Sequence, residues 1–199
     1  MGTPIFAVPV LQALADMPGI EIVGVVTPPN QPAGRGRQPD PPPVKSFALE
    51  RQMLVLQPDS LRQKVTQDEL AALVPDVIVV AAYGQFLPQS VLNLPHNGCL
   101  NLHPSLLPRY RGPTPVPTTI LEGDEVTGVT LMLLDQGMDT GPIIAQTEHP
   151  LDGFETSEDL THALFGLGTE LLVKNLKPWV AGSITADPQD DALATVTHK

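Results

Sequence analysis

Residues 76–82 read DVIVVAA, an aspartate followed by an unbroken apolar run rich in β-branched side chains. Such side chains favour strands, and a strand with one solvated face would alternate apolar and polar residues. This run does not alternate, so we expect both faces of the strand to be covered, as in a parallel sheet between helices. The stretch therefore predicts an α/β fold.

The segments around this strand continue the pattern. Further apolar runs predict strands at 20–27, 98–102, 128–134 and 142–146. Apolar residues at helical spacing predict helices at 8–17, 43–52, 66–73 and 157–176, the last with Ser157 as its N-cap. Strands that alternate with helices predict a Rossmann-like, mostly parallel sheet with helices on both faces.

The composition limits the classes of function. The chain has 199 residues, enough for one domain with its own core, and 11 Lys and Arg against 22 Asp and Glu. A net charge of −11 argues against a protein that coats nucleic acid by bulk charge. The sequence shows neither an apolar run of membrane-spanning length nor a signal-peptide pattern. The single cysteine, Cys99, excludes an intramolecular disulfide and favours a cytoplasmic location.

Basic residues are concentrated in two loops: Arg35, Arg37 and Lys45 in one, and Arg109 and Arg111 in the other. Arg35 and Arg37 lie within the proline-rich stretch 28–43, whose seven prolines exclude a helix or a central strand there. Solvated loop charges and a local phosphate-binding patch on an acidic body both agree with the charges alone.

A polar pair ends the predicted strand at 98–102. Asn101 and His103 are two residues apart, so their side chains share one face and point into the crevice beyond the strand. Asp139 lies in the glycine-flanked turn QGMDTG. A structural pair and a turn carboxylate are the simple explanations. If Asp139 reaches His103, an amide, an imidazole and a carboxylate meet in a site suited to direct attack by a substrate amine.

Longer motifs surround these three residues: NLHPSLLPRYRG at 101–112, TGVT at 127–130 and LDQGMDTGPII at 134–144. Together they resemble the folate-dependent formyltransferase family. Within the family, MGTPIFAVPVLQAL at 1–14, PAGRGRQ at 32–38 and AAYGQFLP at 81–88 are similar to members that act on initiator methionyl-tRNA. The resemblance extends from the first residue to the last.

The resemblance implies transfer of a formyl group from 10-formyltetrahydrofolate to the α-amino group of methionyl initiator tRNA, for translation initiation. Asn101 would stabilise the oxyanion, His103 would transfer a proton or polarise the formyl oxygen, and Asp139 would orient His103. No metal is required. The folate-binding residues implied are Ser105, Leu106, Leu107 and Pro108, with Tyr83, Gly84, Gln85, Phe86 and Leu87. The tRNA-binding residues implied are Arg35, Arg37 and Lys45, in a cytoplasmic, monomeric protein without membrane partners.

The resemblance also implies a catalytic domain over 1–180 and a linker over 181–199 toward a C-terminal tRNA-binding domain absent from this chain. Family members begin with a few apolar residues before MGTP that complete a first strand, and a late start and a truncated strand both remain open. The chain departs from the family at 113–118, where prolines are expected to delay a helix to near Thr118, and at 38–40, where the basic loop carries less charge.

Other interpretations remain open. Sugar-nucleotide N-formyltransferases share the Asn, His, SLLP and Asp pattern, although the loop at 32–38 argues against them. Glycinamide ribonucleotide formyltransferases share GPII, but not the long proline-rich loop. A dinucleotide-binding module is disfavoured, because no G-x-G-x-x-G follows a strand. The last alternative is a fragment that binds folate without turnover.

Overall fold

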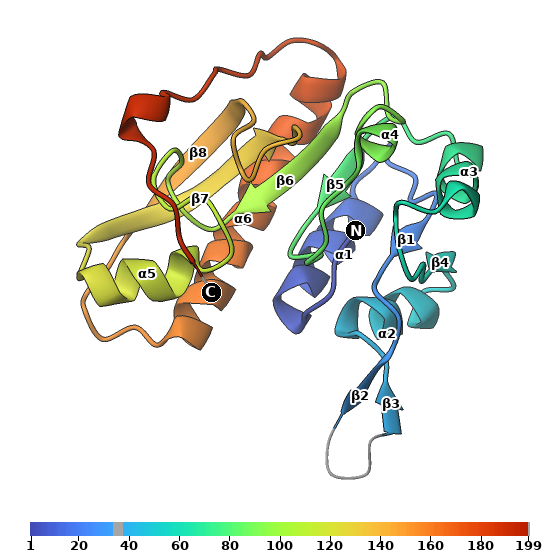
Figure 1. Ribbon diagram of the computed structural model, residues 1–199, viewed down its shortest axis with the longest axis horizontal. Helices are drawn as coiled ribbons and strands as arrows, with labels where there is room; N and C mark the ends of the chain where they lie inside the picture. Colours follow the sequence, from blue (N-terminus) through green and yellow to red (C-terminus); the bar gives the residue numbers. More distant parts are fainter. Residues whose placement is uncertain (34–37, 199) are drawn as a thin grey trace.

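The computed structural model describes residues 1–33 and 38–198. Its main sheet has the order β5 (Ile78–Val80), β6 (Cys99–His103), β7 (Val126–Leu133) and β8 (Ile143–Pro150) (Figure 1). β5 and β6 are parallel, while β7 and β8 join antiparallel. A loop of nine residues connects β7 to β8, and such short connections join antiparallel strands.

A parallel pair extends the arrangement on the other side of β5. β1 (Val25–Val26) pairs with β4 (Val55–Leu56), and the first residues of the chain lie between this pair and β5. Gly2 forms a parallel bridge to Ala81, and its amide donates to the Val26 carbonyl at 3.1 Å. The sheet is therefore parallel from β4 to β6 and antiparallel beyond it.

Helices cover both faces. α1 (Val8–Asp16), α2 (Pro43–Glu50) and α6 (Ser157–Val180) contribute to a core that contains Leu100 and Leu102 of β6. α3 (Lys64–Ala72) and α4 (Gln89–Leu92) contribute to a second core, which contains Cys99 of the same strand. Because successive residues of a strand point to opposite faces, the two cores lie on opposite sides of the sheet. The predicted α/β fold with helices on both faces is confirmed.

α6 is the longest helix, and it packs on β6, β7 and β8. It also holds α5 (Pro115–Glu122) through contacts of Val116 with Leu160 and Leu164. None of the helices in the described part of the chain combines the length and the apolar character needed to span a bilayer.

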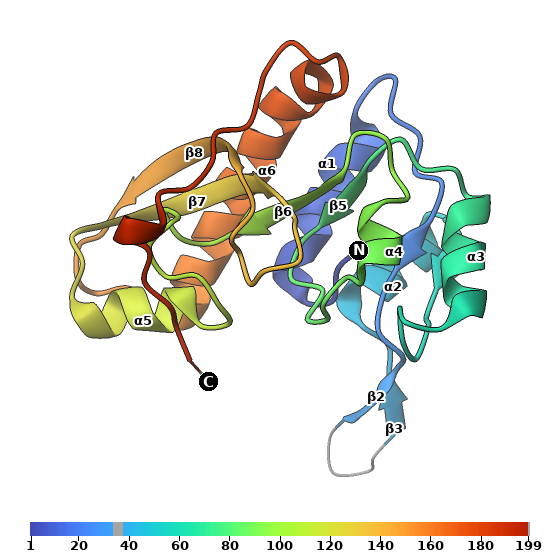
Figure 2. The same cartoon turned by 45° about the horizontal axis from the view of Figure 1, so that its top comes forward.

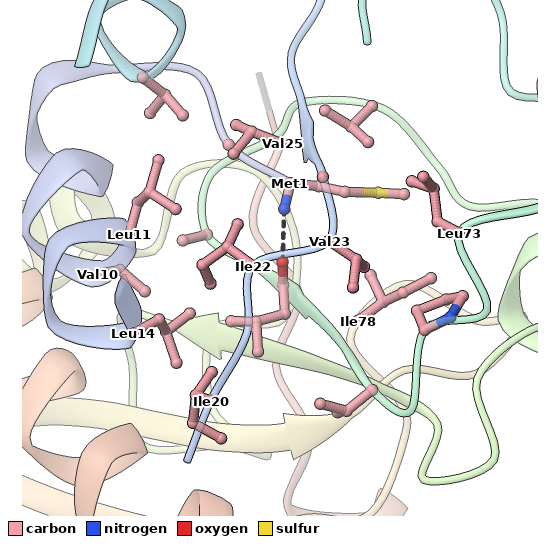
Figure 3. A pocket seen from close by; sticks show the side chains of 18 of the residues that line it. Met1, Val10, Leu11, Leu14, Ile20, Ile22, Val23, Val25, Leu73 and Ile78 are labelled. Atoms are coloured by element: carbon pink, nitrogen blue, oxygen red, sulfur yellow. Dashed lines mark hydrogen bonds between the residues drawn. The ribbon is translucent and has the colours of Figure 1, made fainter. Parts of the chain in front are cut away.

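The strand expected at 20–27 is wrong in its extent. Only Val25 and Val26 form the strand, where they pair with Val55 and Leu56 of β4. The preceding residues border an apolar cavity of about 140 Å³, and no described strand lies beside them to complete a ladder. Figure 3 shows Ile20 and Ile22 on one wall and Leu14 of α1 on another. The Met1 amino group donates to the Val79 carbonyl at 2.6 Å in this cavity, where burial lowers its pKa to about 6.

Two helix starts also differ from the prediction. α5 begins at Pro115 and not near Thr118, because the first amides of a helix have no partner within it and proline has none to lose. The N-cap of α6 is Thr156 and not Ser157, since the Thr156 hydroxyl accepts a hydrogen bond from the Asp159 amide at 3.1 Å.

The proline-rich stretch contains a hairpin, β2 (Gln31–Ala33) and β3 (Gln38–Asp40), whose antiparallel register pairs Gln31 with Asp40. It projects away from the body below α2 and joins neither sheet (Figure 1). The expectation that this stretch forms neither a helix nor a central strand is confirmed for residues 28–33 and 38–42, while Pro43 begins α2.

The chain after α6 returns to the body. Asp187 forms an antiparallel bridge with Ile143 at the start of β8, and Val196 forms a parallel bridge with Arg111. A short 3-10 helix, η2 (Asp191–Leu193), lies between these bridges. Figure 2 shows this segment crossing β8 and β7 toward α5. The expected linker at 181–199 thus includes residues that pack on the sheet, and its role as a linker stays a prediction.

Candidate active site

β6 presents Asn101 and His103 on the same face. The residues between and before them, Leu100 and Leu102, belong to the core under α1 and α6, so the odd-numbered residues of this strand point to the other side. At the start of β6, α4 covers this second face, and Cys99 is only 1% exposed there. Burial raises the pKa of the Cys99 thiol to about 12.

The His103 ring is 4% exposed and has groups of the protein beside both of its nitrogens. Its Nε2 lies 2.8 Å from the carbonyl oxygen of Tyr110. A carbonyl only accepts, so Nε2 carries a hydrogen and donates it. The other nitrogen, Nδ1, lies 3.7 Å from Oδ1 of Asp139. A proton added to this ring is therefore added at Nδ1, beside the carboxylate.

Asp139 reaches His103 from a strained turn. Its φ of 56° lies in the left-handed region, which asparagine and aspartate tolerate better than most residues. Oδ2 accepts a hydrogen bond from the Gly112 amide at 2.8 Å, which leaves Oδ1 on the side of the imidazole. The Asp135 carboxylate instead accepts hydrogen bonds within the same turn, from the Thr140 hydroxyl and from the Gly137 amide. Of these two aspartates, the structure brings Asp139 to His103.

The Asn101 side chain is half-buried at the middle of β6, where Val80 and Met132 pair with it. Within residues 1–33 and 38–198, its amide has no hydrogen-bond partner. An amide that the fold does not use is available to donate to a ligand.

The Ser105–Pro108 segment is fixed by residues that the sequence analysis did not single out as site residues. The Thr130 hydroxyl accepts from the Leu107 amide at 3.1 Å, and Gln146 donates to the Leu107 carbonyl at 2.8 Å and to the Thr130 hydroxyl at 2.8 Å. Thr130 is the last residue of the TGVT motif, and Gln146 pairs with it across β7 and β8. Ser105 is fully buried, and its hydroxyl donates to the Arg109 carbonyl at 2.7 Å. Its side chain supports the turn and does not face an opening.

The Tyr83–Leu87 segment follows β5. The Tyr83 ring is 2% exposed in the core beneath α3 and α4, and burial raises its pKa to about 12. Its carbonyl accepts from the Thr3 hydroxyl at 3.0 Å. Gly84 has a φ of 84°, Gln85 is half-buried, and Phe86 is 69% exposed. The segment thus offers backbone groups and Phe86, while the Tyr83 side chain belongs to the core.

A hollow of about 420 Å³ lies between α4 and the loop that follows β7. It is lined by Gln89 of α4, by Cys99 and by residues 133–137, and Gln136 donates to Gln89 at 2.6 Å. Cys99 and Asn101 share a face, so this hollow opens on the side of the sheet that carries Asn101. Its lining includes Cys99 but none of Asn101, His103 and Asp139.

The basic residues are placed differently from one another. Lys45 of α2 donates to the Asn30 side chain at 3.0 Å and to Gln57, which itself donates to the Pro28 carbonyl. These contacts fasten the base of the β2–β3 hairpin. The predicted tRNA-binding residues Arg35 and Arg37 lie outside the described residues.

The two arginines of the second basic loop, Arg109 and Arg111, both have partners within the protein. Arg109 pairs with Asp124 at 3.0 Å, which raises the pKa of the guanidinium, and it lies over the Tyr110 ring. Arg111 is 6% exposed and donates to Gln189 at 2.9 Å and Asp191 at 2.8 Å. Both side chains are paired within the fold. Among the described residues, no group of three or more histidine, cysteine or acidic residues could hold a metal ion.

Comparison with known proteins extends these observations. The pattern of the family described as formyl transferase matches residues 1–176. Proteins named methionyl-tRNA formyltransferase are 52% identical to this chain in Chloroflexus aurantiacus, over 99% of it, and 48% identical in Stutzerimonas stutzeri, over all of it. The chain spans 63% of the length of each of these curated relatives.

Solved structures with the same fold are more distant in sequence. An N-formyltransferase from Helicobacter canadensis, described as a complex with folinic acid and dTDP-3-aminofucose, has a TM-score of 0.77 at 21% identity, with 98% of this chain and 68% of that one covered. Glycinamide ribonucleotide transformylase 1 from Symbiobacterium toebii has a TM-score of 0.75 at 22% identity, with 95% and 92% covered. These similarities establish the fold.

Proposed function

The chain belongs to the formyl transferase family, and on that premise we propose that it transfers the formyl group of 10-formyltetrahydrofolate to the α-amino group of initiator methionyl-tRNA. The observation that carries the proposal is the arrangement of Asn101 and His103 on one face of β6, with Asp139 3.7 Å from the imidazole. The acceptor is supported by relatives at about 50% identity that are named for it.

The chemistry follows from these positions. The neutral amine attacks the formyl carbon, and the Asn101 amide donates to the oxygen that becomes negative in the tetrahedral intermediate. His103 takes the amine proton at Nδ1, where the Asp139 carboxylate stabilises the imidazolium. Collapse breaks the bond from the formyl carbon to N10 of the folate, and a proton returned from His103 neutralises N10. No metal is needed for any of these steps.

We propose that the donor binds along two segments and in the hollow beside α4. Residues 105–108 are fixed by Thr130 and Gln146, and residues 83–87 offer backbone groups beyond β5. The hollow beside α4 opens on the face of Asn101. We place the pterin side of the folate along Tyr83, Gly84, Gln85, Phe86 and Leu87, and the formyl group toward Asn101.

We propose that the tRNA binds at the β2–β3 hairpin. In the sequence, Arg35 and Arg37 fall between the residues of β2 and those of β3, and Lys45 donates to Asn30 at the base of these strands. A cationic loop on a chain of net charge −11 concentrates phosphate binding in one place, while the acidic body repels other duplexes. We expect a cytoplasmic protein that acts as a monomer.

The test is a formyl-transfer assay with 10-formyltetrahydrofolate and three acceptors in parallel: methionyl initiator tRNA, an amino-sugar nucleotide and glycinamide ribonucleotide. We expect formylmethionyl-tRNA, preceded by one-to-one binding of 5-formyltetrahydrofolate in a calorimetric titration. Transfer only to another acceptor would replace the proposed substrate. A cooperatively melting protein that binds no folate would contradict the proposed donor.

Substitution of Arg35 and Arg37 together by alanine is expected to raise the KM for tRNA roughly tenfold, because two phosphate contacts are lost. The salt dependence of tRNA binding should become shallower, while binding of 5-formyltetrahydrofolate stays the same. The matched control is Arg62→Ala, an exposed arginine outside the hairpin. An unchanged KM and salt slope in the double variant would remove this loop from the tRNA site.

A further inference from the structure

One segment late in the chain binds both loops that support His103 and Asp139. We call residues 187–197, which follow α6 and pack back on the sheet, the docked segment. The loop at 108–114 carries the carbonyl that holds His103 and the amide that holds Asp139. The loop at 135–141 carries Asp139 itself. Along the chain, α5 and β7 separate these two loops.

The docked segment forms hydrogen bonds to the backbone of the loop at 108–114. The Thr195 hydroxyl accepts from the Tyr110 amide at 2.8 Å, and the Thr195 carbonyl accepts from the Arg111 amide at 2.9 Å. The Thr197 amide donates to the Arg111 carbonyl at 2.7 Å. Tyr110 has a φ of 59°, a conformation that surrounding contacts must maintain. These contacts aim the Tyr110 carbonyl at Nε2 of His103.

Gln189 joins the docked segment to both loops at once. Its Nε2 donates to the carbonyls of Asp139 at 2.8 Å and Gly141 at 2.7 Å. Its Oε1 accepts from Nε of Arg111 at 2.9 Å. Because Arg111 is buried, its guanidinium needs such partners, and Asp191 supplies another at 2.8 Å. One amide therefore connects the backbone of Asp139 to the loop that holds His103.

Asp139 is thereby held at two points. Its carbonyl is bound by Gln189, and its carboxylate is bound by the Gly112 amide. Its left-handed backbone would relax if either contact were lost, and the 3.7 Å approach to His103 would change with it. We infer that Gln189 is a positioning residue, which holds Asp139 against His103 from a segment far along the chain. This inference rests on the proposed function, since it assigns Gln189 to the same reaction.

The test combines kinetics with the spectrum of the histidine ring. In Gln189→Ala we expect the imidazole ¹⁵N signals of His103 to move, and kcat to fall roughly tenfold to a hundredfold, the scale of a small misplacement of reacting groups. The KM for the folate and the binding of 5-formyltetrahydrofolate should stay within about twofold, because no folate contact is removed. The matched control is Gln63→Ala, an exposed glutamine before α3, which should change none of these quantities.

A second variant isolates the contact. Gln189→Glu keeps an acceptor for Arg111 but cannot donate to the two carbonyls, so it should move the His103 signals as Gln189→Ala does. If Gln189→Ala does not fold, the His103 signals of Gln189→Glu test the inference. Unchanged His103 signals in a folded variant would overturn the inference, and so would loss of the cooperative melt in both variants. The spectrum is recorded without substrate, so a failure of the proposed formyl transfer is seen separately, as an inactive parent chain with intact His103 signals.

Discussion

Asn101→Ala is expected to lower kcat for formyl transfer by about 10²–10³, the effect of removing one donor to an oxyanion. The Asn101 amide is unpaired among the described residues, so the fold loses no hydrogen bond with it. Binding of 5-formyltetrahydrofolate should stay within roughly tenfold, about 1.4 kcal/mol, because the ground-state donor carries no negative charge on its formyl oxygen. The measurement pairs single-turnover kinetics with calorimetry.

Asn101→Asp serves as the size-matched variant. It keeps the shape of the side chain but replaces the amide donor by a carboxylate that repels the oxyanion, so its loss of rate should be at least as large. Asn175→Ala is the control, because the Asn175 amide donates to the Leu171 carbonyl within α6, away from the site. Folate binding that falls as much as the rate would mean that Asn101 holds the folate and not the intermediate.

Asp139→Asn is expected to lower kcat by about 10²–10⁴, as when a general base loses its partner. The geometry should survive, because asparagine tolerates the φ of 56° and its carbonyl oxygen can still accept from the Gly112 amide. The lost quantity is the negative charge beside Nδ1 of His103, which stabilises the imidazolium formed during the reaction. The measurement is kcat with saturating folate and tRNA.

Asp135→Asn provides the comparison from the same turn. Asp135 bonds Thr140 and the Gly137 amide, so its substitution loosens the turn without removing charge from the imidazole. We expect a loss of rate at least an order of magnitude smaller than that of Asp139→Asn. Equal losses would show that the turn as a whole, and not the Asp139 charge, sustains the reaction.

The limits of the sequence are clearest at the prolines and at the ends of the strands. Proline patterns excluded a helix from the 28–43 stretch but misplaced the start of α5, because a proline at the first helical position costs no hydrogen bond. The apolar run at 20–27 predicted a longer strand than the two residues observed. A strand needs a neighbour for its ladder, and the pattern of one segment does not say where neighbouring strands end.

The sequence by itself determined the α/β class and the face that Asn101 and His103 share, because residue type and a period of two are properties of one segment. The motif had already implied Asp139 as the partner of His103. Only the tertiary structure decided that its Oδ1 lies 3.7 Å from Nδ1 of His103, and that Arg111 is buried against Gln189. Contacts between residues 78 positions apart depend on how separate loops fold onto one sheet. Local patterns carry no information about such packing.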